Sequence, residues 1–297
     1  LKIKKLITLE IDEYRLSILN REIRSNKNLK KKYIDYLIDA NNLKLTDKIF
    51  KNHKPDLVFH AAASKHVDLV ERNWFQSSLN NIKTTYNVCK LAFKYSVKKV
   101  IFISTDKAVD PINFLGFSKS VGEKIFLIFG AKNKNTSFSI VRFGNVVGSS
   151  GSLLDTIKHQ LDLSNEIILT DKRMTRYFMT ISDAVNLVLI SSKISQNSNC
   201  HVLKMGNPVK IIDIIKNIIK ENPSKAKIRV VGRRPGEKLH EKLFDTKNVE
   251  KTDHKYILNE KQNVNLKQSD IDNLVRQLED CISNKNKFKK LLKKFIN

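Results

Sequence analysis

The chain has 297 residues, of which 41% are hydrophobic, and a formal net charge of +25. This length is enough for one large α/β domain, or for a nucleotide-binding domain with a small companion. The excess of lysine is spread over many segments, and the sequence shows no helix-turn-helix, zinc finger or aromatic-rich RNA-binding strand. We therefore expect no nucleic-acid partner, but a basic surface that attracts anionic small molecules.

Short β-rich runs alternate with longer helical patterns, which predicts βαβ units and a parallel sheet. The first half predicts strands at 4–10, 30–39, 55–63, 98–105 and 137–149, separated by helices at 12–24, 45–53, 80–96 and around Lys119. From about residue 150 the pattern is less regular, with strands at 166–170, 200–205 and 227–231 and helices before, between and after them, at 182–192 and 211–220 among others. The segment from about 260 predicts a helical, charged and peripheral tail.

The cysteines and the apolar runs narrow the class of protein further. Cys89, Cys200 and Cys281 have neither CxxC spacing nor neighbouring histidines, which argues against a metal site and against a disulfide framework. No stretch approaches the roughly 18 apolar residues of a membrane span, and no signal peptide is visible. We expect a cytoplasmic protein with no metal and no membrane segment in this chain. Leu1 in place of Met is typical of a fragment, a processed product or an unusual start.

Three polar stretches directly follow predicted strands: HAAASKH, STDK and FGNVVGSSGS. Ligands bind beyond the carboxyl ends of strands in such sheets, so these stretches are expected to converge on one crevice. The small residues Ala61, Ala62 and Ala63 would let a flat, bulky cofactor approach the backbone, or they simply pack a tight turn.

A lysine, Lys119, follows Ser104 by fifteen residues. Many nicotinamide enzymes place a tyrosine four residues before such a lysine to move a proton while hydride moves. Here that position is Leu115, which can neither donate nor accept a proton. A redox site of this kind must therefore keep its acid and base elsewhere.

Four stretches carry a resemblance to a known family: 59–71 (FHAAASKHVDLVE), 104–119 (STDKAVDPINFLGFSK), 172–185 (KRMTRYFMTISDAV) and 232–244 (GRRPGEKLHEKLF). With 142–152 (RFGNVVGSSGS) between them, the sequence resembles the nucleotide-sugar 4,6-dehydratases of the extended short-chain dehydrogenase/reductase superfamily. It is most similar to the capsular-polysaccharide branch that acts on UDP-N-acetylglucosamine. The resemblance covers about residues 4–245.

The resemblance implies an NAD- or NADP-dependent reaction on UDP-N-acetylglucosamine or a related UDP-sugar, in surface polysaccharide synthesis. Oxidation at C4 makes C5 the α-carbon of a ketone, water is then eliminated across C5–C6, and the hydride returns to C6. The cofactor is regenerated in each cycle because the net redox change is zero.

The same resemblance implies catalytic roles for four residues. Asp106 and Lys107 correspond to the elimination pair, with Asp106 protonating the leaving hydroxyl and Lys107 taking the C5 proton, unless they are only a surface ion pair. Thr105 would hydrogen-bond O4, and Lys119 the nicotinamide ribose. With Leu115 inert, deprotonation of O4 would fall to Lys107, to Asp106, or to Lys119 through the ribose hydroxyl.

The implied binding residues divide between substrate and cofactor. Arg234 and Glu237 would clamp the UDP part, with the guanidinium on the diphosphate and the carboxylate on ribose hydroxyls. Lys65, Asn145 and Arg173 resemble residues that face the sugar or its phosphates. The implied cofactor residues are Glu10 at the adenosine ribose, Asp39 at the adenine, Ala61, Ala62, Ala63 and Lys119.

The family's Gly-x-x-Gly-x-x-Gly loop after a first strand does not occur in these 297 residues. In the strand order 3-2-1-4-5 that strand is central, so its absence separates its two neighbours and removes the cradle for the cofactor pyrophosphate. We therefore expect an α/β protein with a Rossmann-like, doubly wound parallel sheet that lacks its first strand. The expected parts are an NAD(P)-binding domain (1–150), a small nucleotide-sugar-binding α/β subdomain (151–259) and a basic helical tail (260–297).

Three functional hypotheses remain open from the sequence. The first is the dehydratase. The second is a UDP-sugar epimerase of the same superfamily, and the third is a truncated, non-catalytic remnant that binds UDP-sugar weakly or associates with a homologue. The resemblance also implies a possible homo-oligomer, a dimer or a hexamer.

Overall fold

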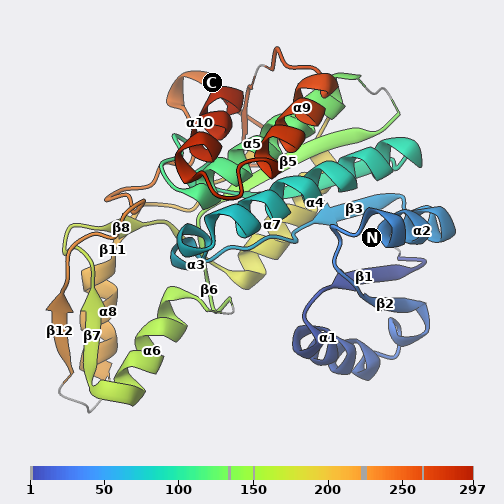
Figure 1. The fold of residues 1–297 in the computed structure, drawn as a ribbon. Coiled ribbons are helices and arrows are strands. Elements are labelled where there is room, and N and C mark those ends of the chain that lie inside the picture. Colours follow the sequence, from blue (N-terminus) through green and yellow to red (C-terminus); the bar gives the residue numbers. More distant parts are fainter. Residues whose placement is uncertain (1–2, 133–134, 150, 222–225, 263, 297) are drawn as a thin grey trace.

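The computed structural model describes residues 3–132, 135–149, 151–221, 226–262 and 264–296 (Figure 1). The strands are β1 (Leu6–Glu10), β2 (Tyr33–Leu37), β3 (Leu57–His60), β4 (Lys99–Thr105), β5 (Ser137–Phe143), β6 (Asn145–Val147), β7 (Glu166–Leu169), β8 (Thr175–Arg176), β9 (Phe178–Thr180), β10 (Cys200–Leu203), β11 (Val209–Lys210), β12 (Lys227–Val230), β13 (Val249–Lys251) and β14 (Ile257–Glu260). The α-helices are α1 (Glu13–Ser25), α2 (Leu43–His53), α3 (Val67–Arg72), α4 (Trp74–Lys94), α5 (Phe114–Lys132), α6 (Leu153–Ser164), α7 (Ile181–Ile194), α8 (Ile211–Glu221), α9 (Gln268–Glu279) and α10 (Lys285–Ile296). Short 3₁₀ turns lie at η1 (Lys30–Lys32), η2 (Asp106–Ala108) and η3 (Thr246–Asn248).

The centre of the molecule is a six-stranded sheet in the order β13-β14-β10-β5-β4-β3. The ladders that join β3, β4, β5 and β10 are all parallel, whereas β14 pairs antiparallel with both β10 and β13. The prediction of a Rossmann-like α/β fold with a parallel sheet is confirmed. All carboxyl ends of the parallel strands therefore meet at one edge of the sheet.

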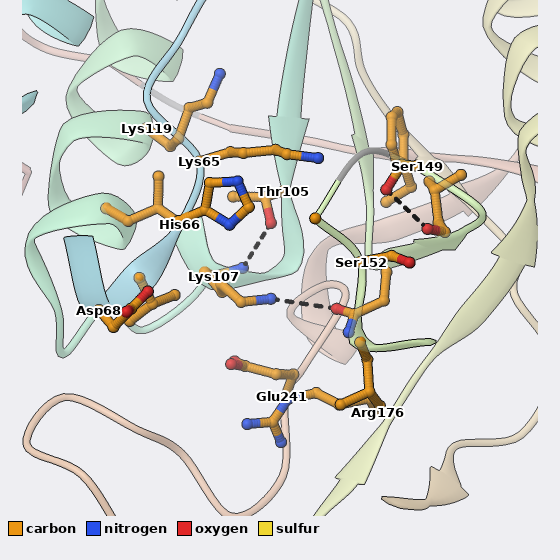
Figure 2. A pocket seen from close by; sticks show the side chains of 18 of the residues that line it. Lys65, His66, Asp68, Thr105, Lys107, Lys119, Ser149, Ser152, Arg176 and Glu241 are labelled. Atoms are coloured by element: carbon orange, nitrogen blue, oxygen red, sulfur yellow. Dashed lines mark hydrogen bonds between the residues drawn. The ribbon is translucent and has the colours of Figure 1, made fainter. Parts of the chain in front are cut away.

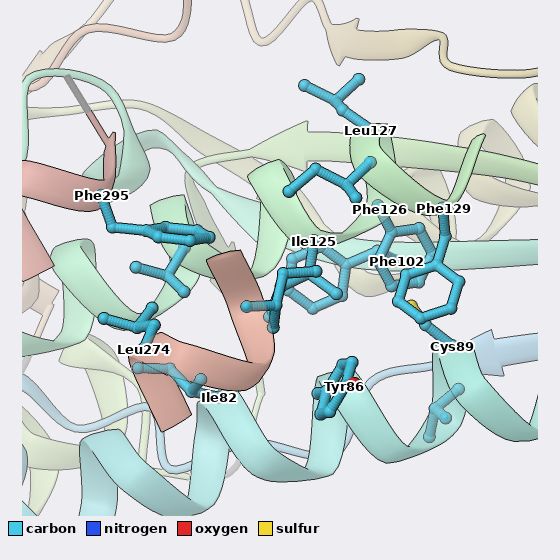
Figure 3. Close-up of a cluster of buried hydrophobic side chains, with 14 of the residues drawn as sticks. Ile82, Tyr86, Cys89, Phe102, Ile125, Phe126, Leu127, Phe129, Leu274 and Phe295 are labelled. Atoms are coloured by element: carbon cyan, nitrogen blue, oxygen red, sulfur yellow. The ribbon is translucent and has the colours of Figure 1, made fainter. Parts of the chain in front are cut away.

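Both faces of this sheet are covered because its central strands are apolar on both sides. Along β4, Phe102 faces the cluster formed with α4, α5, α9 and α10, whereas Ile101 faces the cluster formed with α7. Figure 3 shows the first cluster, in which Ile82 of α4 and Phe126 of α5 lie with Phe102 of the sheet. The sheet is thus the middle layer of three.

The C-terminal helices α9 and α10 lie over α5 and α4 (Figure 1). Their apolar side chains Leu274, Leu278, Phe288 and Leu292 are buried in the main cluster, and Phe288 packs edge-on against Trp74 at 5.2 Å between ring centroids. The tail is helical and basic as predicted, but the prediction that it is peripheral is wrong. The sequence did not predict this burial, because the apolar residues of the tail recur only every three to four positions within runs of lysine.

The strands β1 and β2 form a separate two-stranded parallel sheet. Among the described residues, no ladder of hydrogen bonds joins β1 to β3. The six-stranded sheet therefore ends at β3, and β1 and β2 are not part of it.

A smaller lobe is built from α6, β7, α8 and β12 around its own apolar cluster, with Ile157, Ile167 and Ile215 at its centre. In Figure 1 it lies beyond the carboxyl edge of the main sheet. The elements α7, β10 and β14 also belong to residues 151–259, yet they join the main sheet and its covering layer. Residues 151–259 were predicted to form one subdomain. They do not form one continuous unit, because the chain returns to the main sheet between α6 and α8.

The helices within the described ranges include none with the length and apolarity needed to cross a membrane. The three cysteines are all buried and free.

Candidate active site

A cleft of about 1370 Å³ opens at the carboxyl edge of the parallel strands, between the main sheet and the smaller lobe. This is a large volume for a single small ligand. Side chains from β4, from β5, from the segment that follows β3 and from the 234–241 loop meet there (Figure 2). Among its lining residues are Ala61, Ala63, Lys65, His66, Thr105, Lys107, Asn113, Leu115, Lys119, Asn145, Arg176, Arg234, Glu237, Glu241 and Lys285.

The turn η2 places Lys107 at the cleft wall, directly after β4 ends. Its Nζ donates to Asp106 Oδ1 at 2.9 Å and to Asn145 Oδ1 at 3.4 Å. Thr105 Oγ1 also donates to Asp106 Oδ1, at 2.9 Å. The Lys107 side chain is 16% exposed, whereas that of Asp106 is 0% exposed. Only the amine of this pair is therefore open to the cleft.

Glycine at 116 allows α5 to approach this turn. A Cβ at Gly116 would collide with the carbonyl oxygen of Lys107. The N-terminus of α5 is capped by Asn113, whose Oδ1 accepts from Gly116 N at 2.7 Å and whose Nδ2 donates to Gly236 O at 2.9 Å. The Asn113 side chain thus connects α5, which packs against the η2 turn, to the loop that carries Arg234 and Glu237.

Behind the turn lies a buried charge cluster. Arg142 on β5 donates to Glu123 Oε2 and to Glu260 Oε2, each at 2.7 Å, and Ser104 Oγ donates to Glu123 Oε1 at 2.6 Å. All four side chains are buried. Burial lowers the pKa of Arg142, but the neighbouring Cys200, Glu123 and Glu260 outweigh it and hold that pKa well above its ordinary value. This network fixes the ends of β4 and β5, from which Thr105 and Asn145 continue.

Lys119 on α5 is 7% exposed. Its Nζ donates to Ile103 O at 2.8 Å and lies 4.6 Å from the centroid of Phe102. Burial lowers the pKa of Lys119 to about 8, and the negative charge of Glu123 opposes that shift. Burial therefore destabilises the charged form of Lys119 relative to its neutral form.

The structure brings together most of the residues that the sequence predicts. Nine of them line the cleft: Ala61, Ala63, Lys65, Thr105, Lys107, Lys119, Asn145, Arg234 and Glu237. Glu237 also closes the turn of its own loop, because its carboxylate accepts from Arg234 N and from Thr170 Oγ1, both at 3.1 Å.

Five predicted residues do not line the cleft: Asp106, Ala62, Glu10, Asp39 and Arg173. Glu10 and Asp39 end β1 and follow β2, where their carboxylates accept from the next backbone amides. The side chain of Arg173, predicted to face the substrate, lies outside the lining. Its guanidinium is turned outward by Asp171, to which it donates at 2.8 and 3.0 Å.

Sequence reasoning missed many residues of the lining, among them Arg176, Glu241 and Lys285. Arg176 lies in the same stretch as Arg173, and period-2 alternation along β8 and β9 would have favoured it as the inward residue. Glu241 lies four residues after Glu237, within a stretch that had already been singled out. Lys285 begins α10 and had no sequence signal, because nothing in a lysine-rich tail separates one lysine from the next.

The parallel sheet, the helices on both of its faces and the cleft beyond its strand ends define a Rossmann-like α/β protein of the extended short-chain dehydrogenase/reductase type. The chain belongs to the polysaccharide biosynthesis protein family, whose model matches residues 1–262.

Sequence relatives carry several names. The chain is 38% identical over 249 residues to the capsular polysaccharide biosynthesis protein CapD of Staphylococcus aureus, covering 83% of this chain and 42% of that protein. It is 37% identical over 194 residues to the UDP-N-acetylglucosamine 4,6-dehydratase (inverting) of Campylobacter jejuni, covering 64% and 57%. It is 35% identical over 246 residues to the UDP-glucose 4-epimerase of Rickettsia prowazekii, covering 78% and 72%. The chain thus spans less than half the length of the CapD protein.

Among solved structures, Pen from Bacillus thuringiensis superimposes with a TM-score of 0.80 at 30% identity, covering 89% of this chain and 82% of that one. The overall fold is therefore shared with a crystal structure.

Proposed function

We propose that the chain is the catalytic part of a 4,6-dehydratase for UDP-N-acetylglucosamine or a related UDP-sugar, working in surface polysaccharide biosynthesis. The observation that carries this proposal is the Lys107–Asp106 pair at 2.9 Å, which presents an amine to a large cleft. The similarity to the Campylobacter jejuni dehydratase supports it. Leu115 lines the same cleft at the position where many nicotinamide enzymes have a tyrosine. Proton transfer at this position must therefore be carried out by a group other than a tyrosine phenol.

We further propose that the cofactor is NAD or NADP. The small side chains of Ala61 and Ala63 leave room for a flat ring after the end of β3, and Thr105 and Lys119 line the same cleft as polar partners. These residues fit the nicotinamide riboside half. Glu10 and Asp39, proposed for the adenosine half, lie on the separate β1–β2 sheet and outside the lining. When bound, the nicotinamide accepts hydride from C4 and returns it to C6.

The nucleotide part of the substrate would be held by the 234–237 loop. The exposed Arg234 is free to bind the diphosphate with its guanidinium fork. Glu237 offers its carboxylate to the ribose hydroxyls, and Lys65 and Asn145 lie where the sugar would enter.

Only the neutral amine is a base, so Lys107 would first release the proton that it carries in the ion pair and would then take the proton from C5. Its amine is positioned by Asp106, and the negative charge of Asp106 stabilises the ammonium that forms. The Thr105 hydroxyl lies at the end of β4 and donates its proton to Asp106, so its oxygen would accept a hydrogen bond from the O4 hydroxyl of the sugar.

Two alternatives each have an observation in their favour. A UDP-sugar epimerase is favoured by the similarity to the Rickettsia prowazekii protein, although Leu115 offers no phenol for the proton transfer at O4 that epimerisation typically uses. A non-catalytic remnant is favoured by the separation of the β1–β2 sheet from β3.

The deciding experiment identifies the product. UDP-N-acetylglucosamine is incubated with NAD and either this chain or the chain with a strand, a Gly-x-x-Gly-x-x-Gly loop and a helix fused ahead of Leu1. We expect weak NAD binding by the chain itself, because it carries no glycine-rich cradle, and a 4-keto-6-deoxy sugar from the fusion. Recovery of only a C4 epimer by NMR would favour the epimerase, and no turnover by either protein would favour the remnant.

A further inference from the structure

Lys285 is a lysine of the C-terminal tail that reaches the wall of the cleft. It is the first residue of α10, and no other lysine of that helix is among the described lining residues. The helix lies beyond residues 1–262, which the family model matches. The tail therefore adds a positive charge to a cleft whose other lining residues all lie within the matched part of the chain.

The carboxylate of Glu71, in the last turn of α3, marks where the Lys285 amine lies. Its Oε1 accepts a hydrogen bond from Phe114 N, at the first residue of α5, at 2.7 Å. Its Oε2 lies 3.9 Å from Nζ of Lys285. A Cβ placed on Gly236 would stand 3.4 Å from Oε1 of the same carboxylate. The Lys285 amine and the backbone of Gly236 are therefore both next to Glu71.

The loop that carries Arg234 is held at this same junction. Gly236 has a φ of 80°, in the left-handed region that favours glycine, and its carbonyl oxygen accepts from Asn113 Nδ2 at 2.9 Å. Arg234 lies two residues before Gly236, and both line the cleft. Arg234 and Lys285 are therefore two cations at one end of the cleft, contributed by segments that are far apart in the sequence.

The Lys285 amine is available to a ligand. Its side chain is 49% exposed, and the distance of 3.9 Å to Glu71 Oε2 is too long for a hydrogen bond. Its hydrogen bond within the described residues goes to Glu71 O at 3.4 Å, which leaves further N–H groups of the ammonium to donate elsewhere. Lys238 lines the same end of the cleft but is 13% exposed, and it donates to Val109 O at 2.7 Å. Lys285 is thus the more open of these two amines.

We propose that Lys285 binds the diphosphate of the UDP-sugar together with Arg234, so that the C-terminal tail forms part of the nucleotide site. This inference rests on the proposed function, which places the nucleotide at the 234–237 loop. A guanidinium binds phosphate oxygens as a planar fork and an ammonium binds them as a point charge, so the two cations suit the two neighbouring phosphates. Glu71 is the carboxylate nearest to the Lys285 amine, and the amide of Phe114 compensates part of its charge.

The test measures binding of UDP by calorimetry and of uridine by ligand-observed NMR, on the full chain. The variants are Lys285→Met, Lys285→Arg and the control Lys287→Met, an exposed lysine of the same helix that does not line the cleft. Lys285→Met should weaken UDP binding about 5-fold or more and change uridine binding by less than about 2-fold, because uridine has no phosphate. Lys285→Arg should recover most of the UDP affinity, and Lys287→Met should stay within about 2-fold of the wild type.

The second readout is the dependence of UDP affinity on salt concentration, which should be weaker in Lys285→Met than in the wild type and in Lys287→Met. Equal losses of UDP and uridine binding in Lys285→Met would show that the residue only shapes the site, and would overturn the inference. If the wild type binds UDP and Lys285→Met binds it equally well, the inference fails and the proposed function stands. If the wild type binds no UDP, the nucleotide site of the proposed function fails, and with it the role of Lys285.

Discussion

The Nζ of Lys107 lies 2.9 Å from Oδ1 of Asp106, and the carboxylate partner exposes no surface at all. A carboxylate in such a place is stable only while a cation and hydrogen-bond donors compensate its charge. The pair is therefore a structural unit as well as a chemical one, and its energetics are measurable without substrate.

Replacing Lys107 with Met should destabilise the protein by about 3 kcal/mol, because it leaves a buried carboxylate without its cation. Adding Asp106→Asn to that variant should recover part of the loss, since the neutral amide no longer needs a counter-charge. Urea denaturation of the two single variants and the double variant measures this coupling. Costs that simply add would show that the two side chains do not stabilise one another.

Lys119 predicts a pH dependence of stability. Its pKa in the folded protein, about 8, lies below the ordinary lysine value of 10.5. Between these two values the unfolded chain binds more protons than the folded chain, so stability rises with pH in that window. The contribution is complete above about pH 10.5 and is lost as the pH falls through about 8.

Lys119→Met removes that penalty. At pH 7 we expect a gain on the order of 3 kcal/mol, reduced by the lost hydrogen bond to Ile103 and shrinking steadily between pH 8 and pH 10. The control is Lys132→Met, an exposed lysine at the end of the same helix. A gain that does not change with pH would exclude a buried, titrating amine as its cause.

The C-terminal helices should be necessary for the stability of the whole domain. Phe288→Ala removes a ring with no exposed surface that packs against Trp74, Phe75 and Phe114, so we expect a loss of about 3–5 kcal/mol. Phe93→Ala, at a ring that is 46% exposed, should cost less than about 1 kcal/mol. Equal effects in denaturant melts would mean that α10 is only loosely attached.

Arg234 is expected to bind the nucleotide, and its neighbour Arg233 provides the matched control. Arg234 lines the cleft and Arg233 does not, so Arg234→Met should weaken UDP binding about 10-fold or more through the loss of charge-assisted hydrogen bonds. Arg233→Met and Arg173→Met should change it by less than about 2-fold. Calorimetric titration with UDP measures all three. A large effect of Arg173→Met would restore the role that the sequence gave it.

Local patterns in the sequence predicted the strands, the parallel sheet and the convergence of three loops, because each depends on short-range periodicity and on where strands end. The position of Asp106 was predicted but not its burial, which depends on Gly144 and on the contact of α5 with the turn. The sequence favoured Arg173 as the cleft residue, but Arg176 lines the cleft instead. The guanidinium of Arg173 donates to Asp171, a contact that the sequence pattern did not predict. Lys285 and the buried face of α10 depend on packing between segments that lie some 170 to 210 residues apart in sequence.

The central claim is that the Lys107 amine removes the C5 proton of a UDP-sugar during loss of water. Its most direct test is NMR of the reaction of UDP-N-acetylglucosamine in D₂O, with the wild-type fusion and with its Lys107→Met variant. We predict deuterium at C5 of a 4-keto-6-deoxy product in the wild type and no exchange at C5 in the variant. Exchange at C5 that continues in Lys107→Met would contradict the account.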